Sequence, residues 1–475
     1  MSLTLDRRAD LDLDSFLRVS WQGEGLRFSA AARSRMQAAR SSFLALLDSD
    51  PDIVIYGVTT GYGHQASKRL VGEERKQQAR RPPTGAMTSF GEPLPDRVAR
   101  GIVFARLANF VEGHAAVSPE LAEAVAAMLE RERQPEVPAL GNGCPGEILA
   151  LSHLFHALGS GLELGEKESL SLINGSPCAS ALVADAALAA RRRLALAYLV
   201  FALSIEALKA PLGHYDSALD ALWDDPHDQR ALQELRRLIA GGPAEERRPY
   251  QAPVSWRILP RVLGQAERAV AQAEEVAALA LRSVSDNPVY VPPDAEHPLG
   301  RIMSTGGYHN AAAYPAMDAL TALYADLALI ADRHTDKLMH GRISLLPDGL
   351  RGDGGYIGGL AFASAGFAEQ ARQAATPSLL PAMESGGYGQ NDVPTPVFLA
   401  WRKQAEAGRC LDACLALLAV IASQAFFVTG RQAAPQLAPL VEEVRTLFAP
   451  VIEQRALAYE AEAVAERFTE KVFTP

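Results

Sequence analysis

Long stretches of helical apolar periodicity are the feature that most limits what this chain can fold into. Ala, Leu, Glu and Arg dominate them, and apolar residues recur at three- and four-residue spacing. The longest stretches cover residues 180–210, 261–284 and 315–339, which exceeds the usual length of a globular helix. Strand candidates, at 52–58 and 287–293, are short. The pattern therefore predicts an all-α fold built on a long helical bundle.

Composition excludes several classes of partner. Hydrophobic residues make up 48% and charged residues 21% of the 475 residues, enough for a large core. The net charge is −10 and no Lys/Arg stripe stands out, so we expect neither nucleic acid nor membrane as a partner. The apolar stretch 411–427 is interrupted by Asp412 and Gln424, which favours a buried bundle helix. The N-terminus lacks the apolar run of a signal peptide, and we expect a cytoplasmic protein.

Gly- and Pro-rich segments lie between the predicted helices, and chemistry on a helical scaffold is usually presented by such loops. We expect an N-terminal part, 1–200, that carries a mobile tyrosine-bearing loop at 55–63 and the unusual triplet at 144–146. The second part, 201–475, would supply the long-helix bundle and the C-terminal helices. We expect the two parts to form one catalytic unit.

A glycine-rich loop at 55–63, Ile-Tyr-Gly-Val-Thr-Thr-Gly-Tyr-Gly, presents two tyrosines, Tyr56 and Tyr62. Three glycines allow sharp bends, so a phenol here could reach a ligand. A phenol acts as a base only where charge or hydrogen bonds lower its pKa. A turn with a packed aromatic ring is the alternative that the loop alone leaves open.

This loop resembles the YGVTTGFG segment of the aromatic amino acid ammonia-lyases, the family of histidine, phenylalanine and tyrosine ammonia-lyases and related aminomutases. Other segments resemble the same family in the same order, at 140–153, 172–176, 251–257 and 389–393. The resemblance implies an all-α fold with the long central bundle of the ammonia-lyase and fumarase type. It also implies a homotetramer in which each active site is built from three chains.

Three residues inherit central roles from this resemblance. In the family, the tyrosine at the position of Tyr56 takes the β-proton of the substrate. The asparagine at the position of Asn174 touches both the electrophile and the substrate carboxylate. Arg257 inherits carboxylate binding, for which a bidentate guanidinium is well suited.

Further positions inherit contacts to the substrate. Tyr62 stands where phenylalanine is usual and adds a hydroxyl, while Val254 replaces a tyrosine. The histidine-specific members carry a glutamate at the place of Asn391, so imidazole recognition is not expected. Gly85 and Ala86 align with the pair that selects the substrate. The predicted substrate-binding residues are Tyr62, Gly63, Gln251, Trp256, Tyr308, His309, Gln390 and Asn391, and Tyr62, Trp256 and Tyr308 could hold a cation.

The largest departure from the family lies at Cys144-Pro145-Gly146. The family has Ala-Ser-Gly there, which cyclises and dehydrates into the electrophile methylidene-imidazolone (MIO). Proline has no hydroxyl to lose, and its nitrogen carries no hydrogen. We therefore expect no MIO, and no pattern in the sequence calls for a metal, nucleotide or flavin.

Three hypotheses follow for a protein that binds a small carboxylate. The first is an MIO-independent lyase that expels a good leaving group, as ergothionase, a member of the family, expels trimethylamine. The second is an enzyme of specialised metabolism that uses the pocket for cyclisation, isomerisation or condensation. The third is an inactive homologue that serves as a binding or partner subunit. Cys144 could act as a nucleophile if a helix N-terminus lowered its pKa, or it could be a packing residue.

Overall fold

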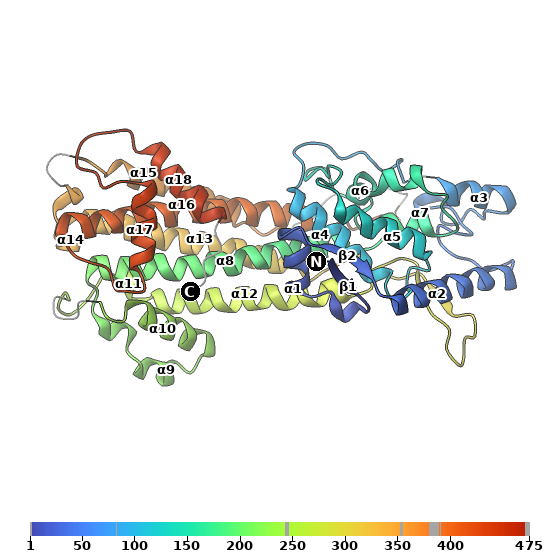
Figure 1. The fold of residues 1–475 in the computed structure, drawn as a ribbon, viewed down its shortest axis with the longest axis horizontal. Coiled ribbons are helices and arrows are strands. Elements are labelled where there is room, and N and C mark those ends of the chain that lie inside the picture. The colour runs from blue at the N-terminus through green and yellow to red at the C-terminus, as the bar shows by residue number, and fades with distance from the viewer. Residues whose placement is uncertain are drawn as a thin grey trace. The chain divides into compact units, whose positions relative to one another are not determined.

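The computed structural model describes residues 2–81, 83–242, 247–351, 355–379, 389 and 391–470, apart from the side chains of 159 and 160. Helices dominate this part of the chain (Figure 1). The chain divides into two compact units. The first comprises residues 1–188, 273–317 and 377–402, and the second comprises 189–272, 318–376 and 403–475. The parts 1–200 and 201–475 stay a prediction.

The first unit contains short helices and two small sheets. The strands are β1 (Ser2–Leu5) and β2 (Gly25–Phe28), which pair in parallel, and β3 (Val289–Val291) and β4 (Arg301–Met303), which pair antiparallel. The helices that lie wholly in this unit are α1 (Leu13–Phe16), α2 (Ala30–Ser49), α3 (Gly72–Arg80), α4 (Asp96–Arg106), α5 (Pro119–Ala127), α6 (Ile148–Gly161) and α7 (Glu168–Ile173).

The second unit contains helices joined by loops, and no strand lies among its described residues. Its own helices are α9 (Ala218–Trp223), α10 (Pro226–Ile239), α11 (Val254–Arg257), α14 (Gly341–Ser344), α15 (Gly359–Ala374), α17 (Ala438–Leu447) and α18 (Ala458–Glu470). The long helices α8 (Pro177–Leu208), α12 (Leu259–Arg282), α13 (Ala313–Met339) and α16 (Val397–Thr429) contribute residues to both units.

Buried polar contacts join the long helices within the second unit. The Tyr198 hydroxyl on α8 donates to Glu267 on α12 across 3.2 Å. Also on α8, Arg193 pairs with Asp412 of α16 at 2.9 Å, and both side chains are buried. Such polar contacts fix the register between helices whose packed faces are rich in Ala and Leu. The predicted all-α bundle is confirmed.

The two strand candidates have different outcomes. Residues 289–291 form β3, whereas 52–58 form no strand. The backbone N–H groups of Val58, Thr59 and Thr60 all donate to the Ile55 carbonyl, which folds the segment into consecutive turns. Gly57 adopts a positive φ of 69°, a conformation that no extended strand contains. The strand interpretation of 52–58 is therefore wrong.

Helix α16 is long and apolar enough, by length and composition, to cross a membrane. However, 89% of its most apolar window is buried inside the protein. Cys410 and Cys414 lie on this helix and are both buried, as expected of packing residues. The burial supports the interpretation of 411–427 as a core helix of the bundle.

Candidate active site

The first unit contains a cavity of about 930 Å³. Loops and helix ends from distant parts of the sequence form its wall. The predicted site residues that line it are Tyr56, Tyr62, Gly63, Gly85, Ala86, Cys144, Pro145, Gly146, Asn174, Tyr308 and Asn391. Lining residues that the sequence did not single out include Arg81, Ser169 and Asn287.

The Tyr56 phenol has a fixed position at this wall. The backbone N–H of Gly63 donates to the Tyr56 hydroxyl oxygen across 3.0 Å. The bond closes the glycine-rich loop on itself, so that Tyr56 and Tyr62 face the same cavity. The hydroxyl is therefore presented to a ligand by the backbone of its own loop.

Helix α3 holds this loop from outside. The Gln78 side-chain amide donates to the carbonyls of Gly57 and Thr60, at 2.9 and 3.0 Å. Gly57 packs so closely that an added Cβ would lie 2.7 Å from a methyl group of Leu170. The contacts specify glycine at this position and make the loop a defined element of the site.

Tyr62 has a different character from Tyr56. Burial raises the pKa of Tyr62 to about 12, with the Arg81 guanidinium acting in the opposite direction. The Tyr62 phenol therefore keeps its proton near neutral pH and can donate a hydrogen bond. Tyr56 is the better placed of the two to act as a base, since its oxygen already accepts one.

The altered triplet lies in the cavity wall before α6. Burial raises the pKa of the Cys144 thiol, and the N–H groups of Leu149 and Ile148 oppose this only in part. Desolvation thus outweighs the activation that a helix N-terminus would supply, which favours the packing role of Cys144 over the nucleophile role. Gly146, at a positive φ of 64°, lets the loop pass against the ring of Tyr308.

Glu147 follows the triplet and caps a helix other than its own. Its carboxylate accepts the backbone N–H groups of Cys178 and, at 2.6 Å, Ala179, in the first turn of α8. Burial raises the pKa of Glu147 to about 7 despite these donors. The side chain ties the triplet loop to the start of α8, three residues beyond Asn174.

Asn174 ends α7 at the cavity wall. Its side-chain amide donates to the Asn287 carbonyl. The Asn287 side-chain oxygen in turn accepts the N–H of Thr305 at 2.8 Å. Among the described residues, the Asn174 side-chain oxygen accepts no hydrogen bond.

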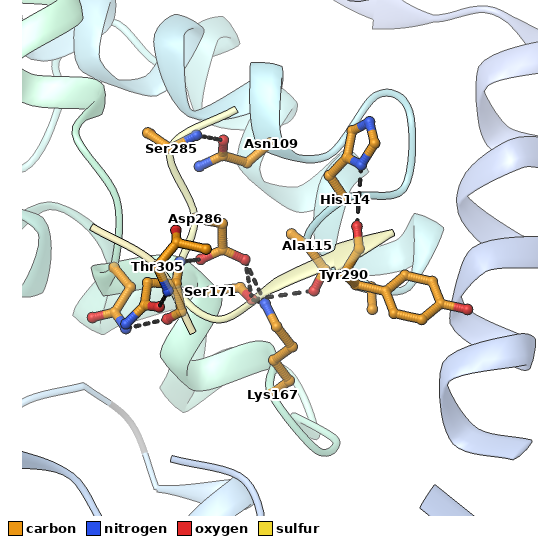
Figure 2. Close-up of polar contacts among 12 residues, drawn as sticks. Asn109, His114, Ala115, Lys167, Ser171, Ser285, Asp286, Tyr290 and Thr305 are labelled. Carbon is orange, nitrogen blue, oxygen red and sulfur yellow. Dashed lines mark hydrogen bonds and ion pairs between the residues drawn. The ribbon is translucent and has the colours of Figure 1, made fainter. Parts of the chain in front are cut away.

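A buried network of polar contacts supports the position of Asn174. Lys167 and Asp286 form an ion pair with both side chains fully buried, and Lys167 also donates to Ser171 at 2.9 Å (Figure 2). Figure 2 also shows Asn109 accepting the backbone N–H of Ser285 at 2.8 Å. The 283–288 segment therefore anchors the asparagine loop.

The predicted residues at 251–257 belong to the second unit and are not among the cavity-lining residues. Gln251 is exposed. Arg257 forms no ion pair within the described part of the chain, and its buried Nε has no hydrogen-bond partner there. An unpaired guanidinium of this kind suits a ligand carboxylate.

Trp256 has a structural role in this unit. Its ring is fully buried and stacks on His334, with centroids 3.6 Å apart and planes 4° from parallel. Its backbone carbonyl accepts the Tyr215 hydroxyl at 3.0 Å. No face of the indole is available to a substrate cation, so we correct that assignment.

The remaining predictions fall around 306–310 and 389–393. Tyr308 lines the cavity, whereas His309 does not and its ring lies edge-on to Tyr314 at 6.2 Å. Asn391 lines the cavity, and Gln390 lies outside the described residues. In the described ranges, no group of three or more His, Cys, Asp or Glu side chains could hold a metal ion.

Arg81 is a charged cavity residue that the sequence did not single out. The basic pair Arg80-Arg81 lies at the C-terminal end of α3, where a charged pair is typical of a solvated helix end. Only the geometry separates the two. Arg80 pairs with Glu163 at 3.0 Å, while Arg81 lines the cavity.

The comparisons with known proteins agree with the geometry. The sequence matches the family model for aromatic amino acid lyases over residues 11–163 and 160–448. It is 31% identical over 392 residues to a histidine ammonia-lyase of Deinococcus radiodurans, covering 76% of this chain and 73% of that protein.

Two solved structures share the fold. The phenylalanine aminomutase of Pantoea agglomerans has a TM-score of 0.90 at 19% identity, and the ergothionase of Treponema denticola has a TM-score of 0.89 at 20% identity. Each comparison covers 99% of both chains. With the tyrosine loop, the asparagine turn and the triplet position around one cavity, the chain belongs to the aromatic amino acid lyase family.

Proposed function

We propose that this protein is an MIO-independent lyase that eliminates a good leaving group from a small, amino-acid-derived carboxylate. The observation that carries the proposal is a contrast within one cavity. Tyr56, the proposed base, and Asn174 both line the cavity, while the centre of the triplet is Pro145. The combination supports a reaction that takes a proton without the family's electrophile.

The residues present do not fit MIO. Its formation needs a serine hydroxyl to lose and an N–H on the same residue, and proline has neither. The Cys144 carbonyl also accepts the Thr395 N–H at 3.2 Å, so it is already engaged in holding the loop. The proposed elimination therefore does not use MIO.

Elimination without an electrophile needs a better leaving group than ammonia. A quaternary ammonium group meets this need because it has no N–H proton to lose and stays positively charged until it departs as a neutral amine. In the proposed step, the Tyr56 phenolate takes a proton from the β-carbon of a trimethylammonium acid. The C–H electron pair forms the Cα–Cβ double bond, and the C–N electron pair leaves with neutral trimethylamine. The Gly63 N–H, already bonded to the Tyr56 oxygen, would hold that oxygen in place throughout.

The carboxylate would be held by two groups. Asn174 is in the cavity wall, and Arg257 has an unpaired guanidinium among the described residues. We propose that the protein is a homotetramer and that Gln251 and Arg257 reach the cavity from another subunit. Tyr308 would face the trimethylammonium group of the bound substrate. The shared fold with an ergothioneine-degrading enzyme supports this scaffold for such substrates.

The test is incubation with the trimethylammonium derivatives of histidine, phenylalanine and tyrosine, followed by detection of trimethylamine and of the unsaturated acid by its ultraviolet absorbance. Tyr56→Phe should lower kcat at least about 10²-fold, the scale of a lost general base. Tyr62→Phe, on the same loop, should retain turnover and change mainly KM. Ammonia release from unmodified histidine, or full activity of Tyr56→Phe, would overturn the proposal. No turnover of any of these acids would favour the inactive-homologue hypothesis.

A further inference from the structure

Arg81 is an unpaired cation in the cavity wall. It follows the last residue of α3, and within the described residues its guanidinium has neither an ion pair nor a hydrogen bond. Glu147 is the one carboxyl group among the lining residues, and its oxygens are occupied by the first turn of α8. Arg81 is exposed in this chain, and its positive charge lies at the cavity wall without a partner among the described residues.

The backbone of Arg81 is held in place from two sides. Its carbonyl accepts the Ser169 hydroxyl at 2.6 Å, and its N–H donates to the Gln78 carbonyl at 3.3 Å. Gln78 also holds the Tyr56 loop through its side chain. One helix thus positions both the proposed base and this cation.

Tyr62 lies within electrostatic reach of Arg81. Both residues line the same cavity, and the guanidinium partly opposes the effect of burial on the Tyr62 pKa. Because the Tyr62 phenol keeps its proton, the pair offers a cation and a neutral donor. That combination suits a carboxylate or another oxyanion.

We propose that Arg81, with Tyr62, binds a second anionic group of the substrate, distinct from the carboxylate assigned to Arg257. The inference rests on the proposed function, since it deepens the substrate class of the same cavity. The substrate is then a diacid: one carboxylate beside the reacting carbons, and another acidic group at the far end of the molecule. Apolar side chains of the lining, Leu170 and Ile173, are available to pack against the part between them.

The test measures binding alone, by titration calorimetry on the full-length protein. The two probes are 3-phenylpropionate and 3-(4-carboxyphenyl)propionate, which share one carboxylate and differ in the second. The wild-type protein should bind the diacid about tenfold or more tightly, the worth of one charge-assisted hydrogen bond. Arg81→Gln should remove this preference and leave the affinity for the monoacid within about twofold, and Arg81→Lys should restore part of it.

Arg80→Gln is the matched control. It removes the same charge one residue earlier, from a side chain that is exposed and paired with Glu163. It should keep the wild-type preference. An equal loss in Arg80→Gln, equal affinity of the wild-type protein for both probes, or a parallel loss for both probes in Arg81→Gln would each overturn the assignment.

The outcome is separable from that of the proposed function. Binding of the probes needs no turnover, so Tyr56→Phe should retain the preference for the diacid even where elimination is abolished. If elimination fails while the preference holds, the reaction is wrong and the anion site stands. If elimination proceeds and the preference is absent, the anion site is wrong.

Discussion

The backbone N–H of Gly63 donates to the phenol oxygen of Tyr56 across 3.0 Å. The two residues are the second and ninth of the 55–63 segment, so the loop that carries the proposed base also fixes its reactive atom. A base held by its own backbone needs no neighbouring side chain to orient it. The integrity of the loop, rather than any single contact to it, should therefore govern activity.

Gly57→Ala tests that dependence. The new Cβ would lie 2.7 Å from Leu170 and would force a side chain onto a φ of 69°. We expect kcat to fall and the free energy of unfolding to drop by more than the ~1–2 kcal/mol of left-handed strain alone. The measurement is turnover together with urea unfolding.

Gly72→Ala separates strain from contact. Gly72 also has a positive φ, of 53°, but nothing lies within 4 Å of the place that an added methyl group would take. It should lose stability through strain alone and keep its activity. Equal losses of activity in Gly57→Ala and Gly72→Ala would show that the close contact of Gly57 with Leu170 does not determine the conformation of the loop.

Gln78→Ala should loosen the same loop from the α3 side. It removes both side-chain hydrogen bonds to the Gly57 and Thr60 carbonyls, each worth about 0.5–1.5 kcal/mol. Amide hydrogen exchange should accelerate across residues 55–63, and kcat should fall. Gln77→Ala, at an exposed neighbour on the same helix, should alter neither. Unchanged amide hydrogen exchange across residues 55–63 in Gln78→Ala would show that Gln78 does not hold the loop.

Glu147 should give the folded protein a pH dependence of a definite sign. Burial raises its pKa from the ordinary value of 4.5 to about 7, so the folded state holds a proton that the unfolded state releases. Between pH 4.5 and about 7 the folded state binds more protons than the unfolded state. The contribution of Glu147 to the free energy of unfolding therefore falls as the pH rises. Glu147→Gln cannot titrate and should show a flatter profile between pH 4.5 and about 7.

The control for that profile is Glu163→Gln, which changes a carboxyl group whose side chain is 78% exposed. Its stability should follow the wild-type slope across the same window. If the free energy of unfolding of Glu147→Gln changed with pH as steeply as that of the wild-type protein, other groups would carry the pH dependence.

Lys167→Met should be the most destabilising of these changes. It leaves the Asp286 carboxylate buried without its cation, a situation that costs about 3–5 kcal/mol. The double variant Lys167→Met/Asp286→Asn removes the stranded charge and should recover part of the loss, as urea unfolding would measure. A double variant less stable than Lys167→Met would contradict the pairing.

Much of the cavity could be predicted from the order of short motifs. Tyr56, Asn174 and the triplet lie at its wall because each belongs to a loop whose local sequence defines its own turn. Trp256 could not be placed in this way. Its burial depends on stacking with His334, a residue distant in sequence, and an indole in a short motif gives no sign of that partner.

The strand expected at 52–58 and the missed Arg81 have the same kind of cause. The β-branched run Ile53-Val54-Ile55 favours a strand by composition, but three N–H groups converge on the Ile55 carbonyl and turn the chain instead. For Arg80 and Arg81, the sequence offers two equal charges at a helix end. Which of them lines the cavity is decided by the long-range contact of Arg81 with Ser169.

The measurement that tests the central claim most directly is the intact mass of the purified protein, with peptide mapping across residues 138–153. An unmodified mass in that peptide is predicted, because Pro145 can lose no hydroxyl and its nitrogen carries no hydrogen. A deficit of two water molecules localised to Cys144-Pro145-Gly146 would contradict the account and return the protein to electrophile-dependent chemistry.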